Sequence, residues 1–264
     1  MAAPRVLLVG TGRTAFHLGH ALVRGKARLT GVMGRDPERT AALALELACA
    51  PLAPGRPLPA CDLVLLAVSD DAIGAVAKRL PRTAAVIAHT SGAQSMAVLG
   101  KPAHGGVLWP IQSLSPGAPA DLAHVPLVID SSDADARKVM LAVAHRISDR
   151  VLELPHKQRE ALHMAAVLAG NFPVFLFACA QHVLRERNLP PDLLTPLWRS
   201  VTQKAADAGP DATLTGPARR GDRKTLGKHL DLLKGDRELR RAYALLSRMI
   251  LAANGHATDG LEDL

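Results

Sequence analysis

A glycine-rich turn stands between a short apolar run and a helical pattern near the start of this chain. The apolar run at residues 5–9 leads into Gly10-Thr-Gly12-Arg-Thr-Ala15, after which apolar residues recur at helical spacing. This order predicts a strand, a tight turn and a helix. Gly10 permits the turn, Gly12 lets the backbone approach a pyrophosphate, and Ala15 keeps the helix close to the strand. The helix N-terminus would then meet the anion without needing a lysine.

Strand-like and helix-like segments alternate as far as about residue 150, and only helical patterns follow. The apolar runs that predict further strands are 29–33, 62–68, 84–89, 106–108 and 126–130. Such alternation predicts an α/β fold with a doubly wound parallel sheet. We expect a dinucleotide-binding domain at residues 1–152 and an all-helical domain at 153–264. Its expected helices are 156–187, broken or kinked by Pro173, then 191–208, 222–234 and 236–253.

Composition argues against several classes of function. Only 3% of the residues are aromatic, so a stacking platform for single-stranded nucleic acid is not expected. The net charge of +8 is dispersed, and the densest basic stretch, 219–228, also contains Asp222, so we expect no nucleic-acid partner. Three separated cysteines give no zinc or disulfide pattern, and we expect a cytoplasmic protein without a metal site. No apolar run approaches the ~18 residues of a membrane span, so no membrane partner is expected.

The residues that follow the second predicted strand decide the expected cofactor. Sites for NAD usually carry an acidic residue here, which accepts from the ribose hydroxyls. This chain has Gly34-Arg35 instead, and Arg35 can pair with a 2′-phosphate and stack on adenine, with Arg39 or Arg13 assisting. A slightly different strand register would make Asp36 the ribose acceptor. We therefore expect NADP, with NAD as the alternative.

Polar residues follow the next two predicted strands at their carboxyl ends, where open α/β sheets bind ligands. Val68-Ser69-Asp70 and His89-Thr-Ser91-Gly92 are expected to flank the nicotinamide side. Alternatively, Ser69 and Asp70 only cap the following helix. The residues expected to bind the cofactor are Gly10, Thr11, Gly12, Arg13, Thr14, Ala15, Arg35, Val68, Ser69, Asp70 and Ser91.

The order of motifs along nearly the whole chain resembles a known family. The motifs that follow the glycine turn are His89-Thr-Ser-Gly92, Pro110-Ile-Gln-Ser113, His163 with Asn171, Leu214-Thr-Gly-Pro217, Arg220-Gly-Asp222 and His229-Leu230. They are similar to those of Rossmann-like proteins with a C-terminal DUF2520 domain, an architecture similar to pyrroline-5-carboxylate reductase, ketopantoate reductase and 6-phosphogluconate dehydrogenase. The resemblance implies an NADP-type oxidoreductase and supplies no substrate. Where the family tends to show His-Pro before the Gln-Ser loop, this chain has Trp109-Pro110.

Two residues of the second predicted domain are candidates for catalysis. His163 could protonate a developing oxyanion or amine, because imidazole titrates near neutrality, and Asn171 is the second candidate. Residues eight apart on an α-helix are offset by about 80°, so the two would lie on adjacent flanks of one face. Related hydroxyacid dehydrogenases carry a lysine four residues before the asparagine. That lysine is absent at the matching spacing before Asn171. Alternatively, His163 only makes a hydrogen bond within a helical interface.

A later segment offers groups for an anionic substrate. Thr215, Gly216 and Arg220 could contact a carboxylate through backbone donors and a guanidinium group. The same segment could instead form an interdomain or dimer contact, or a structural turn with a helix cap.

The expected activity is hydride transfer between NADPH and a small carbonyl, imine or hydroxyacid bound in an interdomain cleft. A protein that binds NADP as a sensor or scaffold, without turnover, is the alternative. We also expect a homodimer formed through the helical domain, whose apolar share includes Phe172, Phe175 and Phe177.

Overall fold

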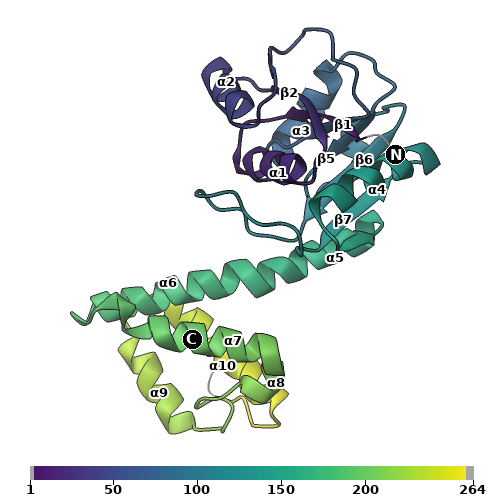
Figure 1. The fold of residues 1–264 in the computed structure, drawn as a ribbon. Coiled ribbons are helices and arrows are strands. Elements are labelled where there is room, and N and C mark those ends of the chain that lie inside the picture. Colours follow the sequence, from purple (N-terminus) through teal and green to yellow (C-terminus); the bar gives the residue numbers. More distant parts are fainter. Residues whose placement is uncertain (1–2, 260–264) are drawn as a thin grey trace. The chain divides into compact units, whose positions relative to one another are not determined.

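The computed structural model describes residues 3–259, and the chain divides into two compact units, Met1–Asn171 and Phe172–Leu264 (Figure 1). The domain boundary expected between residues 152 and 153 falls inside the last strand, one residue before its end at Glu153. The first unit continues beyond it through the helix α5 (His156–Ala166), whose fully buried Arg159 bonds to the sheet. The expected domain boundary stays a prediction.

Eight strands in the described part of the chain form one sheet in the order β3-β2-β1-β4-β5-β6-β7-β8. Neighbouring strands are parallel except β6 and β7, which pair antiparallel. The strands are β1 (Arg5–Val9), β2 (Arg28–Met33), β3 (Pro51–Leu52), β4 (Leu63–Leu66), β5 (Val86–His89), β6 (Gly105–Pro110), β7 (Leu127–Ser131) and β8 (Val151–Glu153). The expected α/β architecture, a doubly wound sheet followed by helices, is confirmed.

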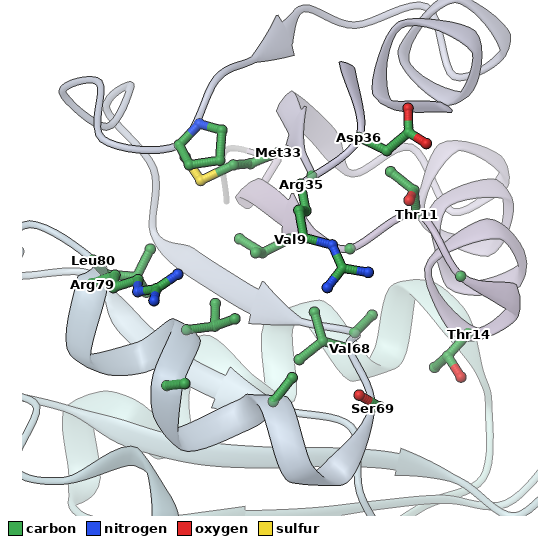
Figure 2. A pocket seen from close by; sticks show the side chains of 18 of the residues that line it. Val9, Thr11, Thr14, Met33, Arg35, Asp36, Val68, Ser69, Arg79 and Leu80 are labelled. Carbon is green, nitrogen blue, oxygen red and sulfur yellow. The ribbon is translucent and has the colours of Figure 1, made fainter. Parts of the chain in front are cut away.

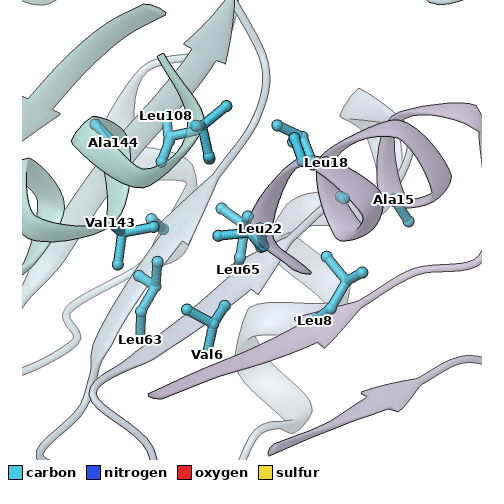
Figure 3. Packing of buried hydrophobic residues seen from close by; sticks show 14 of the residues in the cluster. Val6, Leu8, Ala15, Leu18, Leu22, Leu63, Leu65, Leu108, Val143 and Ala144 are labelled. Atoms are coloured by element: carbon cyan, nitrogen blue, oxygen red, sulfur yellow. The ribbon is translucent and has the colours of Figure 1, made fainter. Parts of the chain in front are cut away.

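Both faces of the sheet are covered. Alternate residues of β1 enter two buried clusters. Leu8 lies with Leu18 and Leu22 of α1 (Arg13–Arg24) on one face (Figure 3). Leu7 lies with Ile73 of α3 (Asp70–Arg79) on the other. The continuous apolar sequence of the central strands follows from this burial on both sides. The other helices of this unit, besides α5, are α2 (Pro37–Glu46), α3 (Asp70–Arg79), η1 (Met96–Leu99) and α4 (Ala134–Ile147).

The sheet differs from the sequence-based expectation in two respects. The sequence does not predict β3 and β8, because two and three residues are too short for a periodic signal. The sequence also predicts a parallel sheet throughout, whereas β7 runs antiparallel to β6. Residues 111–126, which connect the two strands, contain no helix. A parallel pair of strands needs a crossover connection, which is usually an α-helix. The next strand therefore pairs in the opposite direction.

The chain stays helical from His156 to Arg185, although Pro173 predicted a break or kink. The helix α5 passes through a π-helical turn, η2 (Val167–Asn171), into α6 (Phe172–Arg185). Proline has no N–H to bond the carbonyl four residues earlier, and the wider turn before it accommodates this loss.

By length and composition the helix His156–Arg185 could cross a membrane, since its mean hydropathy reaches 1.7. The expectation that no apolar segment approaches the ~18 residues of a membrane span is therefore wrong. The π-helical turn joins two uncharged stretches into one helix. One such helix is weak evidence for a membrane span, and none of its most apolar 18-residue window is buried.

All regular secondary structure among the described residues of the second unit is helical, and the helices expected there are present. After α6 come η3 (Pro191–Leu194), α7 (Thr195–Ala208), α8 (Pro210–Thr213), α9 (Arg223–Leu232) and α10 (Arg237–Ala253). Asp222 caps α9 by accepting from the backbone N–H of Thr225. This is the helix cap that the alternative interpretation of the Arg220-Gly-Asp222 segment predicts. Phe177 stacks on Trp198 with ring centroids 4.8 Å apart, so Phe177 packs inside this unit.

Candidate functional site

A cavity of about 1050 Å³ lies at the carboxyl ends of β1, β2 and β4. In Figure 2, side chains from β1, the segment after β2, and α3 point into it. The expected cofactor-binding residues that line it are Gly10, Thr11, Gly12, Arg13, Thr14, Arg35, Val68, Ser69 and Asp70. Ala15 and Ser91 do not line the cavity. Ala15 is fully buried, as a residue that keeps α1 close to the sheet must be.

The glycine turn has the shape needed to hold a pyrophosphate. Gly10 has φ +127°, and a Cβ there would lie 2.2 Å from the carbonyl oxygen of Ala67, so only glycine fits. A Cβ at Gly12 would meet no atom within 4 Å, and Gly12 precedes the first turn of α1. The backbone N–H groups of that turn therefore face open space at the positive end of a helix. This opening fits a dinucleotide pyrophosphate.

Arg35 and Asp36, which follow β2, have different surroundings. The strand ends at Met33, and Asp36 caps α2, where its Oδ1 accepts from the backbone N–H groups of Glu38 at 3.0 Å and Arg39 at 3.1 Å. Arg35 is exposed and lines the cavity. A Cβ at Gly34 would come within 2.7 Å of the Thr11 side chain, so glycine lets this segment approach the glycine turn.

Asp70 and Ser91 follow adjacent strands and are joined by a hydrogen bond. The Ser91 hydroxyl donates to Asp70 Oδ2 at 2.8 Å and accepts from the backbone N–H of Gln94 at 3.0 Å. Ser69 is the N-cap residue of α3 but makes no capping bond with its side chain. The side chains of Ser69 and Asp70 therefore do not act only as helix caps.

His163 lies against the loop that follows β5. Its ring packs at a tilt on Trp109 of β6, with centroids 5.5 Å apart. A Cβ at Gly92 would come within 2.7 Å of His163 and 2.5 Å of Trp109, so glycine is needed for this packing. No hydrogen bond joins the His163 ring to any described residue, which leaves its nitrogen atoms available. Gly92 follows Ser91, whose hydroxyl donates to Asp70 in the cavity wall. The packing of His163 on Gly92 and Trp109 is thus connected to the cavity through this one hydrogen bond.

The π-helical turn changes the relation expected between His163 and Asn171. An α-helix advances about 100° per residue, whereas the wider π-helical turn advances roughly 80°. With η2 spanning Val167–Asn171, the eight residues complete close to two full turns instead of leaving the expected offset. The two residues therefore lie on one stripe of the helix. Asn171 is exposed, and it does not line the cavity.

A buried polar cluster anchors α5 beside this site. Arg159 is fully buried and donates to Asp130 of β7 and to the carbonyl oxygen of Gln94, each at 2.9 Å. Burial, assisted by the nearby Arg159 charge, lowers the pKa of His89 to about 4. The ring nitrogen Nδ1 of His89 accepts from the backbone N–H of Ser91 at 3.2 Å. His89 is therefore a neutral structural group at the end of β5.

The residues expected to contact substrate lie in the second unit. Thr215 lines an apolar cavity of about 520 Å³ there, together with His229 and Tyr243, which share a 2.6 Å hydrogen bond. Gly216 and Arg220 do not line this cavity. Their role in substrate binding stays a prediction.

Sequence reasoning missed two arginines. Arg79 lines the large cavity from α3, and Arg159 anchors α5. The positions of Ala72, Val76 and Arg79 on one helix face could have revealed the first. The sequence around Arg159 does not reveal its anchoring role, because the oxygen atoms to which it donates, on Asp130 and Gln94, are 29 and 65 residues away.

Comparison with known proteins identifies the family. Residues 125–250 match the model of a domain of unknown function, DUF2520. The structure of a candidate NADP oxidoreductase from Bacteroides fragilis is similar, with TM-score 0.83 and 30% sequence identity over 95% of this chain and 98% of that chain. This chain belongs to the Rossmann-like proteins that carry a DUF2520 domain.

Two further solved structures share the fold of this DUF2520 protein. A protein from Thermotoga maritima aligns with TM-score 0.76 and 24% identity over 95% of this chain and 98% of that chain. An imine reductase variant from Myxococcus stipitatus in complex with NAD+ aligns with TM-score 0.58 and 16% identity over 97% and 96%. No curated protein sequence matches the DUF2520 protein described here.

Proposed function

We propose that this protein is a reductase that transfers hydride between NADPH and a small carbonyl, imine or hydroxyacid. One observation carries the choice of NADPH: Asp36 is engaged in capping α2, whereas Arg35 has no ion-pair partner in the described part of the chain and lines the cavity. A 2′-phosphate would meet the guanidinium group of Arg35, whereas the carboxylate of Asp36 already accepts two backbone hydrogen bonds. The similarity to a candidate NADP oxidoreductase supports the same cofactor.

The residues that would hold NADPH divide by the part of the molecule they face. The turn at Gly10–Gly12 and the N-terminus of α1 would bind the pyrophosphate. Arg35 would pair with the 2′-phosphate. Arg39 lies close enough to assist, because its guanidinium donates to the carbonyl oxygen of Thr11 at 3.1 Å.

The bound nicotinamide would supply the hydride, and the protein would supply a proton and a position for the substrate. His163 is the group we assign to the proton, because its nitrogen atoms are unpaired within the described residues and its ring is held by Trp109 and Gly92. Asn171, on the same stripe of the helix, would donate a hydrogen bond to the substrate oxygen or nitrogen. Trp109 stands where the family tends to have histidine, so it contributes an apolar wall and no proton.

Calorimetric titration with NADPH and NADH tests the cofactor assignment. We expect wild-type protein to bind NADPH more tightly, and Arg35→Ala to lose roughly tenfold or more in NADPH affinity, about 1.4 kcal/mol, with little change for NADH. Arg28→Ala is the matched control, because Arg28 begins the strand β2 that Arg35 follows. Equal loss in both variants, or binding of neither nucleotide by the wild type, would contradict the proposal.

Turnover separates a reductase from a sensor that only binds NADP. A panel of small ketones, cyclic imines and 2-oxoacids is offered with NADPH, and its absorbance at ~340 nm is followed. For a substrate that is reduced, His163→Ala is expected to lower kcat by roughly 10²–10⁴-fold with unchanged NADPH affinity. Tight NADPH binding without turnover on any compound would favour the sensor.

A further inference from the structure

The helix α3 forms a wall of the large cavity that ends in an arginine. Ala72, Val76 and Arg79 follow at helical spacing and all line the cavity, so one face of α3 is small and apolar for two turns and then cationic. Figure 2 shows Arg79 on α3 and Arg35 on the segment after β2, two elements that border the same cavity. The two guanidinium groups therefore reach this space from different walls.

Arg79 is not neutralised by any described residue. Its side chain is exposed and takes part in no ion pair or hydrogen bond within residues 3–259. Two carboxylates line the cavity, and both have other partners: Asp36 caps α2, and Asp70 accepts from Ser91. The arginines Arg13, Arg35, Arg39 and Arg79 also line the cavity and outnumber these carboxylates, so the cavity is basic.

The phosphate groups of a dinucleotide already have partners elsewhere in the cavity. The glycine turn would hold the pyrophosphate, and Arg35 and Arg39 follow β2, where a 2′-phosphate would lie. The remaining space lies along α3, where Ala72 and Val76 leave room for a flat ring. A planar guanidinium at the end of such a wall is suited to stack on an aromatic base.

We propose that Arg79 binds the adenine ring of the dinucleotide and closes the adenine end of the cavity. This inference rests on the proposed function, since it concerns the same site. Arg79 contacts a part that NADPH and NADH share, so it raises the affinity for both. Arg35 discriminates between them, whereas Arg79 does not.

Titration of three variants with NADPH, NADH and 5′-AMP tests this role. Arg79→Ala is expected to weaken all three by a similar factor, roughly three- to tenfold. Arg79→Lys keeps the charge but loses the planar group, and is expected to recover only part of the affinity. Lys78→Ala is the matched control, because this exposed neighbour on α3 does not line the cavity, and it is expected to bind like the wild type.

The other outcomes overturn the assignment in distinguishable ways. A loss confined to NADPH would make Arg79 a 2′-phosphate ligand, and full recovery in Arg79→Lys would replace stacking by simple charge attraction. Wild-type affinity in Arg79→Ala would remove Arg79 from the site and leave the proposed function intact. Failure of the wild type to bind either NADPH or NADH would remove both proposals. Thermal unfolding of each variant distinguishes lost binding from lost folding.

Discussion

The guanidinium of Arg159 is fully buried and donates to Asp130 Oδ2 at 2.9 Å, which ties α5 to the strand β7. His163 follows one helical turn later and packs on Trp109. The ion pair thus fixes the helix that carries the candidate proton donor. Asp130 keeps 21% of its side-chain surface exposed, so water still screens one side of the pair.

Removing the buried charge tests how much this anchor contributes. Arg159→Met is expected to lower the free energy of unfolding by about 2–3 kcal/mol, below the roughly 3–5 kcal/mol of a fully buried pair, because Asp130 is partly solvated. Urea unfolding at neutral pH measures it. Arg137→Met is the control, because Arg137 pairs with Glu153 at the surface and should cost less than about 1 kcal/mol. Equal costs for the two variants would contradict an anchoring role.

Two glycines of the same turn are expected to respond in opposite ways. Gly10→Ala should destabilise the fold, by about 1–3 kcal/mol from backbone strain alone, since its φ is +127° and the carbonyl oxygen of Ala67 blocks a Cβ. Gly12→Val should leave stability within about 1 kcal/mol of the wild type and still weaken NADPH binding at least about tenfold, because its side chain would occupy the open space above the turn.

Chemical unfolding and calorimetry on the same samples give both quantities. Gly227→Val serves as the control, since a Cβ there also meets open space but lies on α9 in the second unit. If Gly12→Val bound NADPH normally, the glycine turn would not be the pyrophosphate site.

Acid is expected to destabilise the protein through His89. Its folded pKa is about 4, below the ordinary value of 6.5, so the unfolded chain binds a proton that the folded chain excludes. Stability from this group is complete above about pH 6.5 and is lost as the pH falls toward 4, by about 3 kcal/mol in total. His89→Asn should flatten this part of the pH profile of unfolding, whereas the exposed His145→Asn should not. An unchanged profile in His89→Asn would assign the acid sensitivity to other groups.

We propose that the apolar surface of the second unit binds a second copy of this chain. Phe172 and Phe175 of α6 are 53% and 67% exposed, and large apolar patches commonly mark interfaces. Light scattering should give about twice the chain mass of 27.9 kDa for the wild type and a smaller value for Phe175→Glu. Leu45→Glu, at a residue 84% exposed on α2, is the control and should leave the mass unchanged. A wild-type monomer would overturn the proposal.

The sequence predicted most of the sheet and the glycine turn because these depend on local signals. Short continuous apolar runs and glycine spacing are read within a few residues, and β1, α1 and β4 follow them. The same reasoning left Arg35 and Asp36 open as ligands. The N-cap bonds of Asp36 appear only in the structure, since the sequence suits either residue as a ligand.

Other parts of the site depend on contacts that the sequence does not encode locally. The packing of Gly92 on Trp109 and His163 joins three separate elements. The alignment of His163 with Asn171 needs the π-helical turn, which periodicity of 3.6 residues misrepresents. These features required the structure.

The single reversed strand pair determines the direction in which the candidate proton donor reaches the site. Because β7 runs against β6 and β8 runs with β7, the chain leaves β8 heading away from the edge where Ser69 and Gly92 lie. The helix α5 therefore runs back along the sheet toward that edge. Its Arg159 contacts Asp130, and its His163 contacts Trp109 one turn later. In an all-parallel sheet, α5 would begin at the edge where Ser69 and Gly92 lie and run away from it. His163 would then lie toward the opposite edge of the sheet.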